Sequence, residues 1–271
     1  MPIHRSIELQ DVGDLGFAEL DAVVMRCAYE TQNAFGRLFD ERVYENDLAF
    51  RLRAEGLDVR TQGLVAVWHR DFVKSYYLDL VVNQMVYELK AVSALLREHY
   101  AQVLNYAMLQ DVRLVKLINF GVVEVSGRLL RNALTEEERY RPVMRKSGWR
   151  PLGLRCEELI AYLKEVIRDW GTHLDCLLYN EALVHHFGGE SNCLRRVEVW
   201  SGDVCLGTHL VQMYDPEHAF AVTGFTRPQA GYRQHLLTLL EHVPGLKGIQ
   251  WINLNHARLE VTTVEADSEK I

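Results

Sequence analysis

Glu88 and Lys90 lie two positions apart in the otherwise apolar stretch MVYELKAV, residues 85–92. Because side chains alternate between the two faces of a β-strand, both would project from the same face. Removing an ion from water costs several kcal/mol unless the ion is paired or bound to a metal. The two residues are therefore expected either to form a simple ion pair within the strand or to belong to a functional site.

Asp79 is a third charged residue in an apolar strand pattern, FVKSYYLDLVV, residues 72–82. Asn83-Gln84 is short enough to join this strand to the next as a hairpin, although Asn-Gly is the preferred pair. The hairpin would bring Asp79 close to Glu88. Two carboxylates in one site repel each other unless a cation lies between them, and oxygen ligands suit Mg²⁺ or Mn²⁺. A lysine beside such a metal can orient or deprotonate the attacking water.

Three further polar residues fall on predicted helices. Glu41 lies in LFDERVYENDLAFRLRAEG, residues 38–56, and is either a site residue or a solvated helix residue. Gln102 and Tyr106 are four residues apart in the predicted helix 95–110, so they share one face. An aromatic residue at this spacing can also belong to the core. His99, one turn earlier, is expected to be a surface residue and is left out of the metal site.

The elements that must position these residues follow a mixed α/β pattern over the first half of the chain. Helical spacing predicts two helices, with Gly36 as the C-cap of the first. Strands rich in Val, Tyr and Leu follow, and then one more helix and a buried strand that ends at Gly121. The expected elements are, in order, helices 17–36 and 38–56, strands 64–68, 72–82 and 85–92, helix 95–110 and strand 112–121.

At this point the motifs resemble a known family. LFDERVYE, YLDLVV, YELKAV, HYAQVLNY and LINFG resemble, in order, the motifs of the GxxExxY group of the PD-(D/E)XK nuclease superfamily, which is similar to the RecB-like branch. Leu38 departs from the glycine of the group's name, although Gly36 stands just before it. The four cysteines that hold an iron–sulfur cluster in some RecB-like members are missing from the first half. The resemblance implies catalytic positions at Glu41, Asp79, Glu88, Lys90, Gln102 and Tyr106.

The same resemblance implies a divalent-metal-dependent nuclease. Asp79, Glu88 and Glu41 would hold Mg²⁺ or Mn²⁺, and Lys90 would activate the water. The expected partner is nucleic acid, with DNA favoured over RNA. Two other interpretations stay open: a catalytically silent nucleic-acid or protein interaction module that keeps the fold, and a non-nuclease phosphodiesterase. Stoichiometric metal binding is not required of an interaction module.

The second half repeats the pattern of the first. GRLFDERVYENDL, beginning at Gly36, aligns with GTHLDCLLYNEAL, beginning at Gly171. VAVWHRD then aligns with VEVWSGD, and KLINF with QWINL, at a nearly constant offset. Three matches in register predict an internal duplication. In the second half Cys176 stands in place of Glu41, AFAVTGFT carries no charge where Glu-x-Lys is expected, and YRQHLLTLL offers no Gln-x-x-x-Tyr. The second copy is therefore predicted to be inactive.

These observations predict two tandem α/β domains of the PD-(D/E)XK (restriction-endonuclease-like) type, each with a mixed central sheet flanked by helices. The expected ranges are 1–132 for the nuclease-like domain, 133–153 for a polar linker and 154–271 for the degenerate copy. The second copy is expected to pack on the first as an intramolecular pseudo-dimer, with a homo-oligomer as the alternative. Arg195, Arg196 and Arg227 could extend the nucleic-acid groove as phosphate contacts.

Composition narrows the function classes further. The 271 residues are 48% hydrophobic and carry a net charge of −7, which argues against binding of nucleic acid through global charge but allows a local basic groove. No run of about 18 apolar residues exists, so no membrane span is expected. The N-terminus lacks the apolar region of a signal peptide. Five cysteines without a CxxC pair favour a reducing, cytoplasmic location, and the scatter of His185, His186, Cys193 and Cys205 fits no common zinc pattern.

Overall fold

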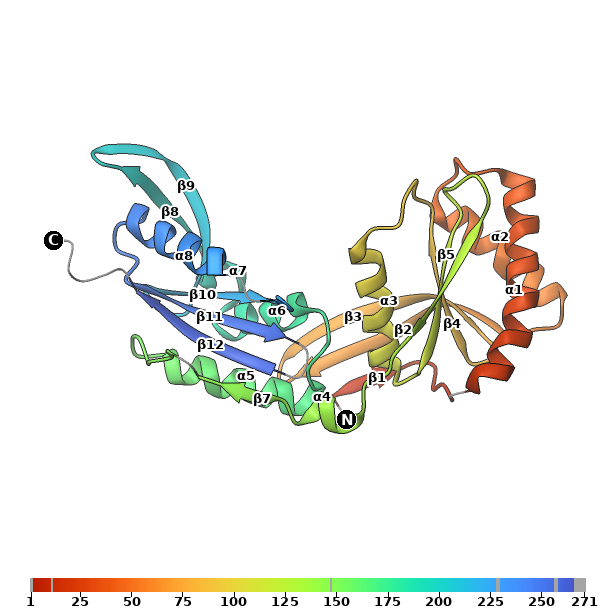
Figure 1. Cartoon of the computed structure of the whole chain (residues 1–271), viewed down its shortest axis with the longest axis horizontal. Coiled ribbons are helices and arrows are strands. Elements are labelled where there is room, and N and C mark those ends of the chain that lie inside the picture. Colours follow the sequence, from red (N-terminus) through yellow and green to blue (C-terminus); the bar gives the residue numbers. More distant parts are fainter. Residues whose placement is uncertain (1, 11, 147, 228–229, 256–257, 266–271) are drawn as a thin grey trace. The chain divides into compact units, whose positions relative to one another are not determined.

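The computed structural model describes residues 2–10, 12–146, 148–227, 230–255 and 258–265. The chain divides into two compact units. The first unit consists of Met1–Trp68 and Val73–Leu134, and the second of His69–Phe72 and Thr135–Ile271. Within the described residues, each unit contains one mixed six-stranded sheet accompanied by helices (Figure 1). The mixed α/β class that the sequence predicts is confirmed for both halves.

Two helices of the first unit pack on one face of its sheet. They are α1 (Gly13–Phe35) and α2 (Glu41–Ala54), and α1 ends at the predicted Gly36, where φ is +71°. Glycine adopts a positive φ without steric cost, which explains why the first helix stops at this residue. The core between helices and sheet contains fully buried apolar side chains from both layers, among them Val24, Leu48 and Leu89.

The sheet of the first unit has the order β1-β2-β3-β4-β5-β6. β4 and β5 are parallel and are connected by α3 (Arg97–Gln110), whereas β3 and β6 run antiparallel to them. Asn83 and Gln84 have φ values of +42° and +76°, so the short hairpin between β3 and β4 turns through two residues in the left-handed region. The strands are β1 (Ile3–Arg5), β2 (Val59–His69), β3 (Phe72–Val82), β4 (Met85–Lys90), β5 (Leu114–Asn119) and β6 (Ser126–Arg131).

The second unit has a sheet with the order β7-β12-β11-β10-β9-β8. Its parallel pair β10–β11 is flanked by antiparallel β9 and β12. The strands are β7 (Val143–Arg145), β8 (Leu194–Ser201), β9 (Val204–Met213), β10 (His218–Thr223), β11 (Gly248–Asn255) and β12 (Arg258–Glu265). The helices are α4 (Glu136–Tyr140), α5 (Cys156–Trp170), α6 (Cys176–His186), α7 (Gly189–Cys193) and α8 (Ala230–His242). No helix in the described part of the chain is both long and apolar enough to cross a membrane.

Residues 133–153, which the polar composition predicts as a linker, contain two elements of the second unit. Thr135 and Glu138 form a capping box that begins α4. β7 pairs in parallel with β12, with Met144 opposite Leu259. A strand of three residues at a sheet edge needs few apolar side chains, so its pairing leaves little trace in the composition.

Candidate active site in the first unit

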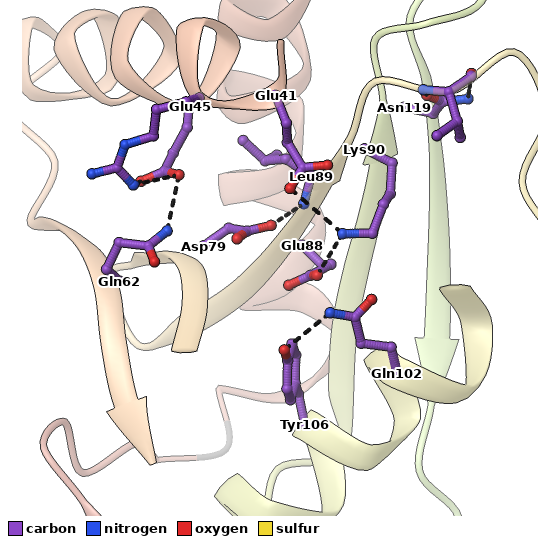
Figure 2. Close-up of polar contacts among 12 residues, drawn as sticks. Glu41, Glu45, Gln62, Asp79, Glu88, Leu89, Lys90, Gln102, Tyr106 and Asn119 are labelled. Atoms are coloured by element: carbon purple, nitrogen blue, oxygen red, sulfur yellow. Dashed lines mark hydrogen bonds and ion pairs between the residues drawn. The ribbon is translucent and has the colours of Figure 1, made fainter. Parts of the chain in front are cut away.

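The register of the β3–β4 hairpin places the first two acids together. Leu80 lies opposite Tyr87, and continuing this register puts Asp79 opposite Glu88. The backbone N–H of Leu89 donates to Oδ2 of Asp79 at 2.8 Å, which ties the aspartate to the next strand (Figure 2). The hairpin predicted from Asn83-Gln84 therefore brings the two carboxylates to one place.

Glu88 and Lys90 form a buried ion pair. Nζ of Lys90 donates to Oε1 of Glu88 at 2.8 Å, with the two side chains 11% and 1% exposed. The other carboxylate oxygen of Glu88, Oε2, is buried without a hydrogen-bond partner. Nζ also lies 3.6 Å from Oε1 of Glu41, at the start of α2. A simple strand ion pair would satisfy both partners, so the unpartnered oxygen and the third acid favour a functional site.

Burial raises the pKa of two acids in the charged cluster, which consists of Glu41, Asp79, Glu88 and Lys90. Burial raises the pKa of Glu88 to about 8, the Asp79 carboxylate adds to the rise, and Lys90 opposes it. Burial also raises the pKa of Glu41, against the effect of Lys90. Burial alone would lower the pKa of Lys90, but the neighbouring carboxylates, Glu88 first among them, hold it above its ordinary value. One lysine does not offset three acids, and the cluster would gain from a further cation.

Gln102 and Tyr106 lie beside the charged cluster on α3. Nε2 of Gln102 donates to the hydroxyl of Tyr106 at 3.0 Å, and Figure 2 shows both side chains on the side of Glu88 and Lys90. Burial, followed by the nearby Glu88, raises the pKa of Tyr106 to about 12, so its hydroxyl keeps its proton. His99 instead accepts the backbone N–H of Leu96 through Nδ1, so this histidine caps the helix.

The backbone that follows Lys90 is held in place from β5. Oδ1 of Asn119 accepts the N–H of Val92 at 3.1 Å, and its Nδ2 donates to the carbonyl of Val92 at 2.8 Å. The carbonyl of Lys90 itself accepts the N–H of Phe120 at 2.7 Å. A Cβ on Gly121 would lie 2.4 Å from the backbone nitrogen of Val92, so only glycine permits this approach. Lys90 therefore projects from a strand end with little freedom to move.

Glu45 and Gln62 are two neighbours of the charged cluster that sequence reasoning missed. Glu45 is buried one helical turn after Glu41, and its carboxylate accepts from Arg42 at 2.8 and 2.9 Å and from Gln62 at 3.0 Å (Figure 2). Burial raises the pKa of Glu45, which Arg42 opposes and Asp79 reinforces. The spacing of four from Glu41 could have identified Glu45. Gln62 has a φ of +54° inside β2, and no sequence signal marks this position. Asn119 was likewise missed, although the repeat gives a signal for it: an asparagine stands at the same place in LINF of the first half and in WINL of the second half.

The donor set fits a divalent cation that keeps some of its water. Among the described residues, no three His, Cys, Asp or Glu side chains form a group that could hold a metal by themselves. Asp79 and the unpartnered Oε2 of Glu88 still offer two carboxylates close together, and the backbone N–H of Leu89 is bonded to the first of them (Figure 2). Mg²⁺ is commonly bound through one or two carboxylates and several waters, so two acids are sufficient.

The sequence around the charged cluster matches a known protein family. Residues 18–131 match the family model described as the PD-(D/E)XK nuclease superfamily. The matched range contains all six predicted site positions, from Glu41 to Tyr106. The match supports a nuclease-type function for the first unit, in a superfamily whose members typically use divalent metal ions. Searches of curated proteins and of solved structures gave no match. The second unit lies outside the matched range.

Proposed function

We propose that the first unit is a divalent-metal-dependent nuclease that hydrolyses phosphodiester bonds, with DNA as the expected substrate. One observation carries the proposal: a buried glutamate, Glu88, has one oxygen on Lys90 and the other unpartnered, opposite Asp79. This combination is costly for folding, and it suits a site where a cation and a reacting water are handled together. The family match independently supports the same reaction class.

Each side chain has a role in this proposal. Asp79 and Glu88 would hold Mg²⁺ or Mn²⁺ together with the backbone carbonyl of Leu89, and Glu41 would contribute directly or through water. The bound ion would supply Lewis-acid stabilisation of the negative charge that develops on the phosphate. With the carboxylates committed to such an ion, less negative charge would face Lys90; its pKa would then fall, and Nζ would take a proton from the attacking water. Gln102 and Tyr106 would position the lysine or the scissile phosphate.

We further propose that the second unit is a degenerate, inactive copy of the first. Thr223 pairs with Asn253 as Lys90 pairs with Asn119. Two positions earlier, Ala221 occupies the place of Glu88. The three register matches in the sequence and the flanked parallel strand pair in both units support the duplication. The exposed side chains of Arg195 and Arg196 are adjacent on β8 and project to opposite faces, so these two arginines do not form one basic patch.

The proposal is tested by comparing Lys90→Ala with Lys116→Ala in the full-length protein. Lys116 is also a buried, ion-paired lysine, bonded to Asp21 at 2.5 Å, but it lies on β5 outside the charged cluster. Cleavage of labelled DNA and RNA in Mg²⁺ and Mn²⁺ should fall on the order of 100- to 10,000-fold for Lys90→Ala. The Lys116→Ala control should lose stability but retain its rate per folded molecule.

Circular dichroism and titration of Mn²⁺ should show that Lys90→Ala still folds and still binds metal. Equal cleavage by Lys90→Ala and the unaltered protein would assign the activity to another site or to a contaminant. The absence of both stoichiometric metal binding and nucleic-acid cleavage in the unaltered protein would instead support the silent interaction module, and metal binding without such cleavage would support the non-nuclease phosphodiesterase.

A further inference from the structure

The turn between α1 and α2 exposes large apolar side chains next to the candidate active site. Leu38 is 92% exposed and Phe39 is 51% exposed. Arg37, beside them, is exposed and has no hydrogen-bond or ion-pair partner among the described residues. Apolar side chains that gather at the surface cost solubility and commonly mark binding sites. We name residues 37–39 the RLF turn.

The RLF turn is held rigidly, so its exposure is not the result of a loose loop. The hydroxyl of Tyr44 donates to the carbonyl of Gly36 at 3.0 Å and accepts the N–H of Phe39 at 3.1 Å. Tyr44 is fully buried and stacks on Phe120, with ring centroids 4.6 Å apart. The ring of Phe39 meets Phe35 edge to face at 6.0 Å. A buried anchor therefore fixes the backbone while the side chains point into solvent.

The second unit contains the same anchor but does not expose its turn. The hydroxyl of Tyr179 donates to the carbonyl of Gly171 at 2.8 Å, and Gly171 has a positive φ as Gly36 does. In the sequence alignment Thr172 and Leu174 correspond to Arg37 and Phe39, and they are 0% and 5% exposed. The anchor thus works equally well with a buried turn. At these two aligned positions, only the unit that carries the charged cluster exposes its side chains.

Phe39 stands two residues before Glu41, whose carboxylate lies 3.6 Å from Nζ of Lys90. We infer that the RLF turn binds unpaired nucleotides of the strand that enters the active site, so the preferred substrate is single-stranded or carries a single-stranded arm. Phe39 stacks on a base and Arg37 contacts a phosphate. An exposed aromatic ring and an unpaired cation two residues apart in one turn match the two surfaces of an unpaired nucleotide, its flat base and its anionic backbone. This inference rests on the proposed nuclease function of the same site.

The experiment compares the full-length protein with Phe39→Ala, Arg37→Ala and the control Phe50→Ala, which removes an exposed phenylalanine outside the RLF turn, on α2. Binding of labelled oligothymidylate, oligouridylate and a blunt duplex is measured by fluorescence anisotropy in EDTA, where cleavage cannot occur. Phe39→Ala should weaken single-strand binding roughly 5- to 100-fold and leave duplex binding unchanged. Arg37→Ala should reduce the salt dependence of log K by about 0.7. Phe50→Ala should bind as the unaltered protein does.

Several outcomes overturn the inference: no measurable single-strand binding, stronger binding of the duplex, or equal affinities for Phe39→Ala and Phe50→Ala. Cleavage that does not depend on Phe39 would leave the nuclease function standing and remove only this inference. Single-strand binding that depends on Phe39, without cleavage in any metal, would leave the inference standing and remove the nuclease function.

Discussion

The two units contain the same backbone anchors around different interiors. In each unit a buried tyrosine, Tyr44 on α2 or Tyr179 on α6, donates to a glycine carbonyl eight residues earlier. On the fifth strand of the first unit Asn119 holds both polar groups of Val92, and on β11 Asn253 holds both polar groups of Phe225. Each anchor satisfies backbone groups that a turn leaves without partners. The tyrosine and the asparagine therefore stabilise the backbone in both units, with or without the charged cluster.

The two units share these anchoring residues, but only the first unit has charged side chains at the corresponding strand positions. Relative to the asparagine, Lys90 of the first unit corresponds to Thr223 and Glu88 corresponds to Ala221. In the second unit this region is a pocket whose lining includes Cys176, Val211 and Ala221. The second unit builds the framework without any buried ion pair at this position, so folding does not require one. The cost of burying Glu88 and Lys90 in the first unit is therefore best explained by function.

The largest effect on cleavage is expected when the first unit loses the buried charge that the second unit lacks. Glu88→Gln keeps the shape and an acceptor for Lys90 but removes the charge, so cleavage should fall on the order of 1,000-fold and Mn²⁺ binding should be lost. Thr223→Ala, at the corresponding place of Lys90, should leave cleavage within about twofold. Thr223 bonds Asn253 and Trp251, so this variant should lose about 1–3 kcal/mol of unfolding free energy.

Calorimetric titration with Mn²⁺, steady-state cleavage and urea unfolding check both variants. Wild-type metal affinity and rate in Glu88→Gln would show that Glu88 is a structural ion pair. A loss of cleavage in Thr223→Ala at full folding would place part of the site in the second unit.

Much of the first unit could be predicted from the sequence because its signals are local. Gly36 ends a helix, and Asn83-Gln84 is a turn that needs positive φ values, so the hairpin and the pairing of Asp79 with Glu88 follow from the strand period. The family resemblance to the superfamily is supported over residues 18–131. The spacing also predicted that Glu88 and Lys90 share a strand face.

The remainder depends on contacts between distant residues. β7 pairs with β12 more than a hundred residues later, and a polar stretch gives no sign of this. Gln62 reaches Glu45 only because its own backbone leaves the strand conformation. The roles of the six site positions, the metal and the inactivity of the second copy stay predictions until the chemistry is measured.

An intermediate effect is expected from the two asparagine anchors. Asn119→Ala and Asn253→Ala each remove three hydrogen bonds to buried or half-buried groups, so each should lose about 1–3 kcal/mol of unfolding free energy. Asn119→Ala should also lower cleavage about tenfold or more, because the backbone beside Lys90 is released and the lysine loses its fixed position. Asn253→Ala should not lower it. Both rates are measured well below the unfolding transitions; equal rates would show that the position of Lys90 does not depend on this anchor.

The smallest effect is expected from the tyrosine anchors, and it separates the framework from the RLF turn. Tyr179→Phe and Tyr44→Phe each remove a hydroxyl that donates to a glycine carbonyl, which should lower the unfolding free energy by about 0.5–1.5 kcal/mol per lost hydrogen bond. Tyr44→Phe also frees the N–H of Phe39, so the exposed turn becomes mobile and pays ordering entropy when a strand binds. Single-strand affinity in EDTA should therefore fall a few-fold in Tyr44→Phe and stay unchanged in Tyr179→Phe. Equal affinities in both variants, with the expected losses of stability, would show that the rigid presentation of Phe39 does not contribute to binding.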